Sequence, residues 1–94
     1  HGYSQSMNAY INAADKAFES EDYYSALEYY QTALEFDSTR TDLRYLLAES
    51  ARLFNAYSTA INNYKIISES DSIGNYPELT FRLGELYQRS VNYE

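Results

Sequence analysis

The sequence predicts an all-α fold, a solenoid of helix–turn–helix pairs. Shifted against itself by 34 residues, the chain matches at small and aromatic positions. The matching pairs are Ala14 and Ala48, Tyr23 and Tyr57, Ala26 and Ala60, and Tyr30 and Tyr64. A period of this length is typical of stacked helical repeats. No stretch alternates strictly between apolar and polar residues, so the sequence leaves no room for a sheet.

The first three predicted helices follow from apolar residues spaced three and four apart. The first helix spans about residues 4–20. Asp22 is a good N-cap for the second helix, which runs to about residue 36. A polar break at 37–39 separates the second helix from the third, which covers about residues 41–53.

The last two predicted helices are joined by the longest loop. The fourth helix covers about residues 57–68, and the polar loop that follows runs to residue 76. Gly74 is the expected flexible point of this loop. Pro77 suits the first turn of a fifth helix, because its missing N–H has no partner to lose there, and we expect this helix to continue to about residue 90.

Composition favours one small packed domain that neither binds nucleic acid nor inserts directly into a membrane. Hydrophobic residues make up 45% of the 94 residues, and the chain has twelve tyrosines but no tryptophan. A net charge of −7 opposes binding to a phosphate backbone. No apolar run is long enough to insert into a membrane, and the lack of cysteine removes disulfides and thiolate metal ligands. His1 and Gly2 fit a tag remnant, and we interpret the chain as a segment of a longer protein.

The recurring residues resemble the motif of tetratricopeptide repeat (TPR) proteins. The first repeat, about 7–40, supplies Tyr10, Ala13, Ala14, Ala17, Ala26, Tyr30 and Ala33. The second, about 41–76, supplies Leu47, Ala48, Ala51, Ala60, Tyr64 and Ile67. The partial third repeat, about 77–94, supplies Leu83, Gly84 and Tyr87. An additional tyrosine recurs where the second helix of each repeat is expected to begin, as Tyr23, Tyr57 and Tyr93.

The resemblance implies a right-handed α-solenoid with two full helix pairs and the first helix of a third pair. It also implies a role in protein–protein interaction. Ala14, Ala48 and Gly84 would let paired helices approach closely. Four positions depart from the motif: Ser38 and Ser72 replace its proline, and Arg44 and Thr80 replace its first aromatic. The alternative is a generic helical bundle with accidental spacing.

A narrower resemblance concerns the runs 22–27, 33–37 and 51–57. They are similar to the TPR region of envelope lipoproteins that serve bacterial gliding motility and type IX protein secretion. This resemblance implies a cell-envelope assembly protein, located in the bacterial periplasm or associated with the outer membrane.

Reaction chemistry finds little support in the sequence, and we expect neither an enzyme, a cofactor nor a metal site. The single histidine, His1, is terminal, and the three glycines are too far apart to form a phosphate loop. Asp15 and Glu19 share a helix face, but carboxylates on an open helix are usually solvated.

A partner-binding groove is the predicted functional site. In a TPR stack, one face of each first helix lines the concave surface, which here gives Ile11, Asp15, Phe18, Asp42, Tyr45, Glu49, Arg52, Glu78, Phe81, Glu85 and Arg89. Ile11, Tyr45 and Phe81 would form an apolar row. Asp15, Glu49 and Glu85 would form an acidic row beside it.

Such adjacent rows would suit a protein or peptide segment that bears apolar and Lys/Arg side chains. The alternative is that the acidic row is only solvated and the apolar row packs between helices. A second functional hypothesis makes the segment a structural spacer, or a homo-oligomerisation segment that associates through the exposed third-repeat helix.

Overall fold

The computed structural model describes the backbone of residues 2–93 and the side chains of residues 5–91. Its elements are α1 (Gly2–Glu19), α2 (Tyr23–Phe36), α3 (Thr41–Leu53), α4 (Tyr57–Ser68), the short 3-10 helix η1 (Asp71–Asn75) and α5 (Leu79–Tyr93). No strand occurs in this part of the chain, so the predicted all-α class is confirmed. The predicted His1 tag remnant and the Tyr93 side chain lie outside the described residues.

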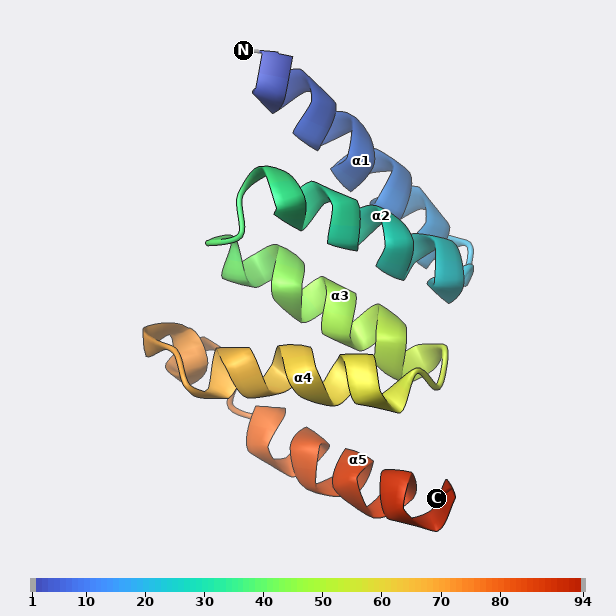
Figure 1. Cartoon of the computed structure of the whole chain (residues 1–94), viewed down its shortest axis with the longest axis vertical. Coiled ribbons are helices and arrows are strands. Elements are labelled where there is room, and N and C mark those ends of the chain that lie inside the picture. The colour runs from blue at the N-terminus through green and yellow to red at the C-terminus, as the bar shows by residue number, and fades with distance from the viewer. Residues whose placement is uncertain (1, 94) are drawn as a thin grey trace.

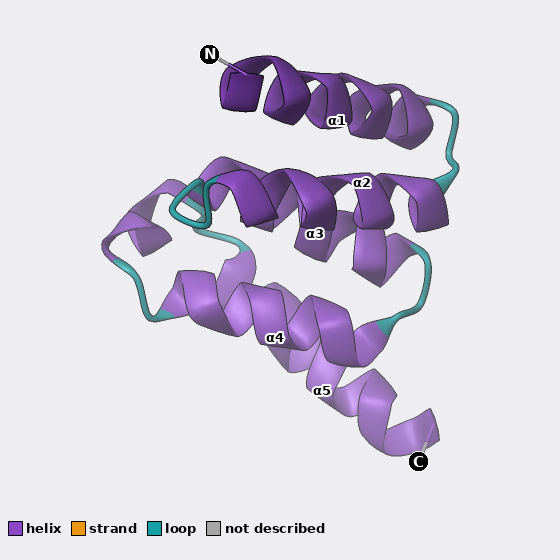
Figure 2. Ribbon diagram, turned by 45° about the horizontal axis from the view of Figure 1, so that its top comes forward, coloured by secondary structure: helices purple, strands orange, loops and turns teal. Residues whose placement is uncertain are grey.

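The helices follow one another in a zigzag, and each packs mainly on the next one along the chain. Figure 1 shows this succession from α1 at one end to α5 at the other. In Figure 2, α2 passes in front of α3 and α4 in front of α5, so α3 and α5 lie behind the even-numbered helices. The molecule is accordingly elongated, with extents of 43 × 29 × 19 Å.

Small residues at the helix crossings form the centre of the core. Ala14, Ala26, Ala48 and Ala60 have no exposed surface, which confirms that the recurring alanines are packing positions. Large side chains fill the space beside them, and the ring of Tyr64 is completely buried. Because protein interiors are closely packed, an alanine at each crossing sets how near the two helix backbones lie.

In each of the two helix pairs, a corner of the same backbone geometry connects the first helix to the second. Glu21 (φ 62°) and Asn55 (φ 68°) have left-handed backbone conformations, and they are 34 residues apart. After each of them a backbone N–H reaches back over the helix end, from Asp22 to the Ala17 carbonyl and from Ala56 to the Ala51 carbonyl, both at 2.8 Å. This is the Schellman arrangement, which satisfies carbonyls at a helix C-terminus.

Glu21→Gly is expected to stabilise the protein by about 0.5–1 kcal/mol, because glycine enters the left-handed region without the steric cost of a Cβ atom. Asn55→Gly is the matched control and should change stability by only a few tenths of a kcal/mol, since asparagine tolerates this conformation better than glutamate. Urea unfolding of the two variants measures the difference. Equal effects at the two corners would contradict the explanation.

The fifth helix begins later than the sequence predicts. Pro77 lies in a turn and not in the helix, which starts at the fully buried Leu79. The Leu79 N–H donates to the Tyr76 carbonyl at 3.0 Å, so the turn is closed before the helix starts. The preceding polar loop contains the 3-10 helix η1.

The structure shows the surroundings of the two glycines to which the sequence assigned roles. Gly74 does not adopt a positive φ and is part of η1. A Cβ atom added at Gly84 would meet nothing within 4 Å, and the residue is exposed. No described helix packs closely on Gly84, unlike Ala14 and Ala48, and the helix expected to pair with α5 is not among the described residues, so the role of Gly84 stays a prediction.

Candidate functional site

Two tyrosine–carboxylate hydrogen bonds recur with the period of the sequence. Tyr30 Oη donates to Asp15 Oδ1 at 2.5 Å, and Tyr64 Oη donates to the Glu49 carboxylate. Each bond links the first helix of a pair to the second and spans 15 residues. Two members of the predicted acidic row are therefore engaged within the fold.

Glu49 lies at the centre of a larger polar cluster. Its side chain is 14% exposed, and its Oε1 atom accepts a hydrogen bond from Arg52 Nη2 at 2.9 Å. Arg82 Nε of α5 approaches Glu49 Oε2 to 3.8 Å. Because a buried carboxylate is costly unless it is paired, these three groups stabilise one another.

A second contact, one helical turn from Glu49 on α3, joins α3 to the segment that leads into α5. Tyr45 Oη donates to Glu78 Oε1 at 2.6 Å, just before α5 begins. The Tyr45 ring stacks on the Tyr76 ring, and the two ring centroids are 4.5 Å apart. These contacts and the Glu49–Arg82 pair define a line of polar side chains that we call the α3–α5 seam.

The other end of the α3–α5 seam opens into a pocket of about 130 Å³. The pocket is lined by Arg52, Leu53, Asn55, Glu85, Leu86 and Arg89. Leu86 is buried, whereas Arg89 is exposed. The pocket thus combines an apolar floor with two guanidinium groups and one carboxylate.

Six of the eleven predicted groove residues come together along this seam. They are Tyr45, Glu49, Arg52, Glu78, Glu85 and Arg89. These six residues come from α3 and from the segment that includes the start and middle of α5, whereas Asp42 and Phe81, which were predicted on the same face, are not among them. Sequence position did not show that Tyr45, Glu49 and Glu78 bind one another or their own neighbours.

The five other predicted residues have different surroundings. Ile11 is half-buried and packs against the core, and the Phe18 ring lies edge-on to Tyr23 at 5.3 Å. Asp15, as described above, accepts a hydrogen bond on α1. Asp42 forms a two-point ion pair with Arg40, at 3.0 and 2.9 Å.

Phe81 is the exception in the predicted apolar row, because 71% of it is exposed. Ile11 and Tyr45 instead pack partly against the core. The alternative interpretation was that this row packs between helices. The surroundings of Ile11 and Tyr45 agree with it, and those of Phe81 do not.

Sequence analysis did not identify three residues that contact the seam side chains. Arg82 and Tyr64 contact Glu49, and Tyr76 stacks on Tyr45. A repeated signal could have revealed Tyr64. An acidic residue is followed 15 positions later by tyrosine in both repeats, as Asp15 with Tyr30 and Glu49 with Tyr64. No comparable repeat identifies Arg82.

The buried tyrosine hydroxyls are held in their neutral form. Burial, and then the hydrogen bond to Asp15, raises the pKa of Tyr30 well above its usual value of 10.0. Burial and the Glu49 bond do the same to the pKa of Tyr64, and burial and the Glu78 bond raise the pKa of Tyr45. An ionised phenol at these positions would lie beside a carboxylate of the same charge.

We expect stability to fall as the pH rises above 10. The unfolded chain releases the tyrosine protons near pH 10.0, whereas the folded chain retains them, so stability is complete below this pH and is lost above it. Thermal melts from about pH 8 to about pH 11.5 measure the loss. Tyr64→Phe should show a shallower decline, and an identical slope would contradict this assignment.

No family model matches the chain, and comparison with curated proteins finds no relative. Within the described residues, no cluster of His, Cys, Asp and Glu side chains could hold a metal ion. The helices in the same part of the chain are too short or too polar to cross a membrane.

Proposed function

We propose that the chain is a TPR-type solenoid that serves as a protein–protein interaction scaffold. The observation that carries this proposal is the recurrence of structural detail at 34 residues. The left-handed corner, the buried alanines and the tyrosine–carboxylate bond all repeat with this offset. Repeats that place one conformation at a fixed interval are the basis of stacked binding surfaces.

The partner segment binds along the α3–α5 seam in this proposal. Phe81 is not part of the seam, but it lies one helical turn from Glu85 on α5 and supplies an exposed ring next to it. Glu78 and Glu85 supply the carboxylates of this surface. A segment with an apolar side chain and a Lys or Arg would meet complementary groups there. In this proposal, the Glu49–Arg82 and Tyr45–Glu78 contacts fix the position of α5 relative to α3.

The narrower resemblance supports a location for this scaffold. Similarity to the TPR region of gliding-motility and type IX secretion lipoproteins favours a bacterial cell-envelope assembly protein. We therefore propose that the partner is another envelope component, met in the periplasm or at the outer membrane.

Site-specific photocrosslinking in the cells that produce the chain tests the proposed surface. A photoreactive phenylalanine replaces Phe81 in one variant and Arg89 in a second. Both should crosslink to the same partner protein. Ile66 on α4 is the matched control, because it is 49% exposed and lies on another helix. Equal crosslinking from position 66, or none from positions 81 and 89, would contradict binding at the seam.

A structural role remains a second candidate, and one observation favours it. Tyr87 and Val91 on α5 are 46% and 73% exposed, and they lie one helical turn apart. Large apolar side chains on an outer helix can join two copies. If they do, sedimentation equilibrium should show a mass that rises with protein concentration, and Val91→Glu should abolish the rise.

A further inference from the structure

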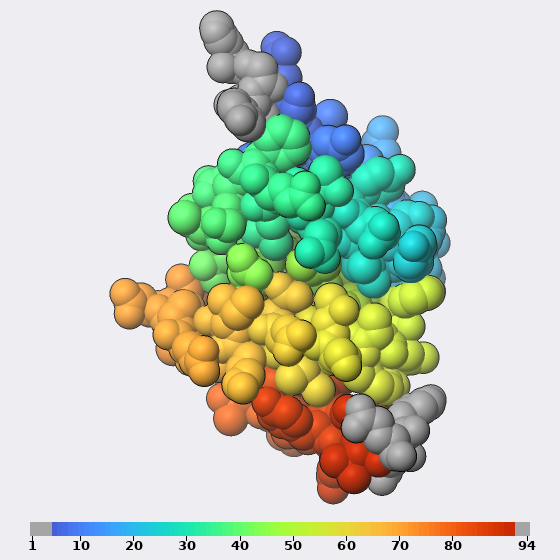
Figure 3. All heavy atoms as spheres, in the orientation of Figure 1, coloured from blue at the N-terminus to red at the C-terminus, as the bar shows by residue number. Residues whose placement is uncertain are grey.

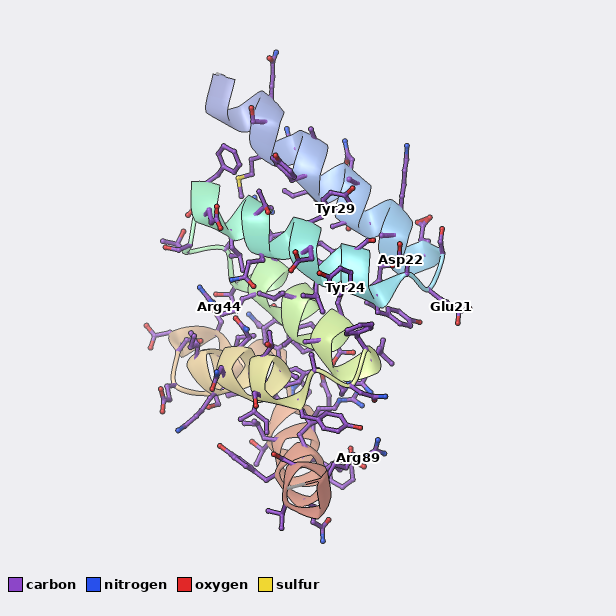
Figure 4. The ribbon with its side chains drawn as sticks, turned by 45° about the vertical axis from the view of Figure 1, so that its right-hand side comes forward. Glu21, Asp22, Tyr24, Tyr29, Arg44 and Arg89 are labelled. Carbon is purple, nitrogen blue, oxygen red and sulfur yellow. The ribbon has the colours of Figure 1, made fainter. Side chains whose placement is uncertain are left out.

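The outer face of α2 carries aromatic side chains along both of its edges. Successive helical residues turn by about 100°, so Tyr24, Glu28 and Glu35 point away from the buried Ala26. In Figure 3 the helix faces the viewer across the upper half of the molecule. Figure 4 shows Tyr24 and Tyr29 on this helix, with Glu21 and Asp22 at the corner before it.

One edge of this face is formed with α1. The Tyr10 ring centroid lies 6.3 Å from that of Tyr29 and 6.0 Å from that of Phe36. Tyr10 and Tyr29 remain 36% and 39% exposed despite these contacts. An open hollow of about 390 Å³ adjoins the rings, and it is lined by Tyr10, Thr32, Glu35 and Phe36. The carboxylate of Glu35 therefore stands at the rim of an aromatic hollow.

The other edge is formed with the end of α3. Tyr24 and Phe54 have ring centroids 5.2 Å apart and are 52% and 49% exposed. The exposed Glu28 and Glu35 lie between the two aromatic edges, about 10 Å apart along the helix. The face is thus two aromatic groups separated by a strip of carboxylates.

In the described part of the chain, neither of these carboxylates pairs with a cation. Helix α2 contains neither Lys nor Arg, and residues 1–38 hold seven acidic side chains against Lys16 alone. Within residues 5–91, no ion pair involves Glu28 or Glu35. Arg44 is engaged elsewhere, since it donates to Asn63 Oδ1 at 2.9 Å and to the Ser38 carbonyl at 3.3 Å.

We propose that the outer face of α2 binds a basic segment of a partner protein through its Arg or Lys side chains. A cation over the exposed ring of Tyr10 gains the attraction of the ring, and the Glu35 carboxylate neutralises its charge. The aliphatic stem of the same side chain covers the exposed aromatic surface. Charge complementarity thus selects the occupant, and the rings supply the contact area.

This surface is separate from the α3–α5 seam, and the inference does not depend on binding there. It is built from α1, α2 and the end of α3, with no contribution from α5. A scaffold with both surfaces could hold two segments at once.

A titration with tetra-arginine amide, followed by NMR at low salt, tests the proposal. The largest chemical-shift changes should fall on Tyr10, Thr32, Glu35 and Phe36. Tyr10→Leu keeps an apolar side chain but removes the ring face, and it should raise the Kd about threefold. Glu35→Gln should raise the Kd by a similar factor, about two- to fivefold, because it removes the one carboxylate at the hollow.

Glu69→Gln is the control for general electrostatics, because it removes the same charge from an exposed site after α4. It should leave the Kd within about 1.5-fold of the parent value. The proposal is overturned if Glu69→Gln and Glu35→Gln weaken binding equally, or if the shifts fall on the α3–α5 seam. Circular dichroism confirms that each variant is folded, so no result reflects unfolding.

Discussion

Tyr64→Ala is expected to cost about 3–5 kcal/mol of folding free energy, because it leaves a large cavity at a side chain with no exposed surface. A domain of this size has a total stability of only about 5–14 kcal/mol. The variant should therefore unfold at a much lower urea concentration than the parent protein. Circular dichroism at increasing urea measures the shift, and an unchanged slope of the transition shows that only stability has altered.

Tyr64→Phe separates the hydroxyl from the ring. It retains the packing but removes the donor to Glu49, whose side chain is only 14% exposed, and it should cost about 1–2 kcal/mol. Tyr30→Phe removes the equivalent donor from Asp15, which is exposed and can bind water instead, so its cost should be about 0.5 kcal/mol. Equal costs for the two variants would show that burial of the acceptor has no influence.

Glu49→Lys is expected to lower the melting temperature by about 10–20 °C. The change places an ammonium group beside Arg52 and Arg82 and removes the acceptor of Tyr64. Leaving partly buried charges unpaired should cost about 2–3 kcal/mol, and each kcal/mol shifts the midpoint by about 4–8 °C in a domain of this size. Thermal melts at low and high salt measure the effect.

Asp15→Lys is the matched control for Glu49→Lys. It stands at the equivalent place in the first repeat and also loses a tyrosine bond, but it is exposed. Its melting temperature should fall by less than half as much. Added salt should restore part of the loss in Glu49→Lys, since ions screen the repulsion among the three cations. A melting temperature for Glu49→Lys close to that of the parent would refute the central role of this carboxylate.

The helices were predictable because their information is local and periodic. Ala26 and Ala60, or Tyr30 and Tyr64, repeat at one interval and lie on the buried side of their helices. The corners were harder to predict from the sequence, because Glu21 adopts a left-handed conformation that glycine usually supplies. The start of α5 was also missed, because the Pro77 signal fits a turn before a helix as well as its first turn.

The candidate site was predicted only in part, for a different reason. Position within the repeat indicates which side of a helix a residue occupies. It contains no information on how the surroundings of that position differ from one repeat to the next. Asp15 and Glu49 share a position, yet only Glu49 has an arginine of a later helix, Arg82, beside it. The burial and partners of a side chain therefore depend on which helices flank its repeat, and the period contains no such information.

The tyrosine–carboxylate bond also bears on how such a chain can grow. Its donor and acceptor are 15 residues apart, less than half of the 34-residue interval. Tandem duplication of a segment that starts before the acid and ends after the tyrosine copies both partners in one event. Each new repeat then contains both the donor and the acceptor of this bond, so no compensating substitution in an existing repeat is needed. Lengthening by gene duplication is thus compatible with this bond, whereas exchange of a single helix between units would separate Glu49 from Tyr64.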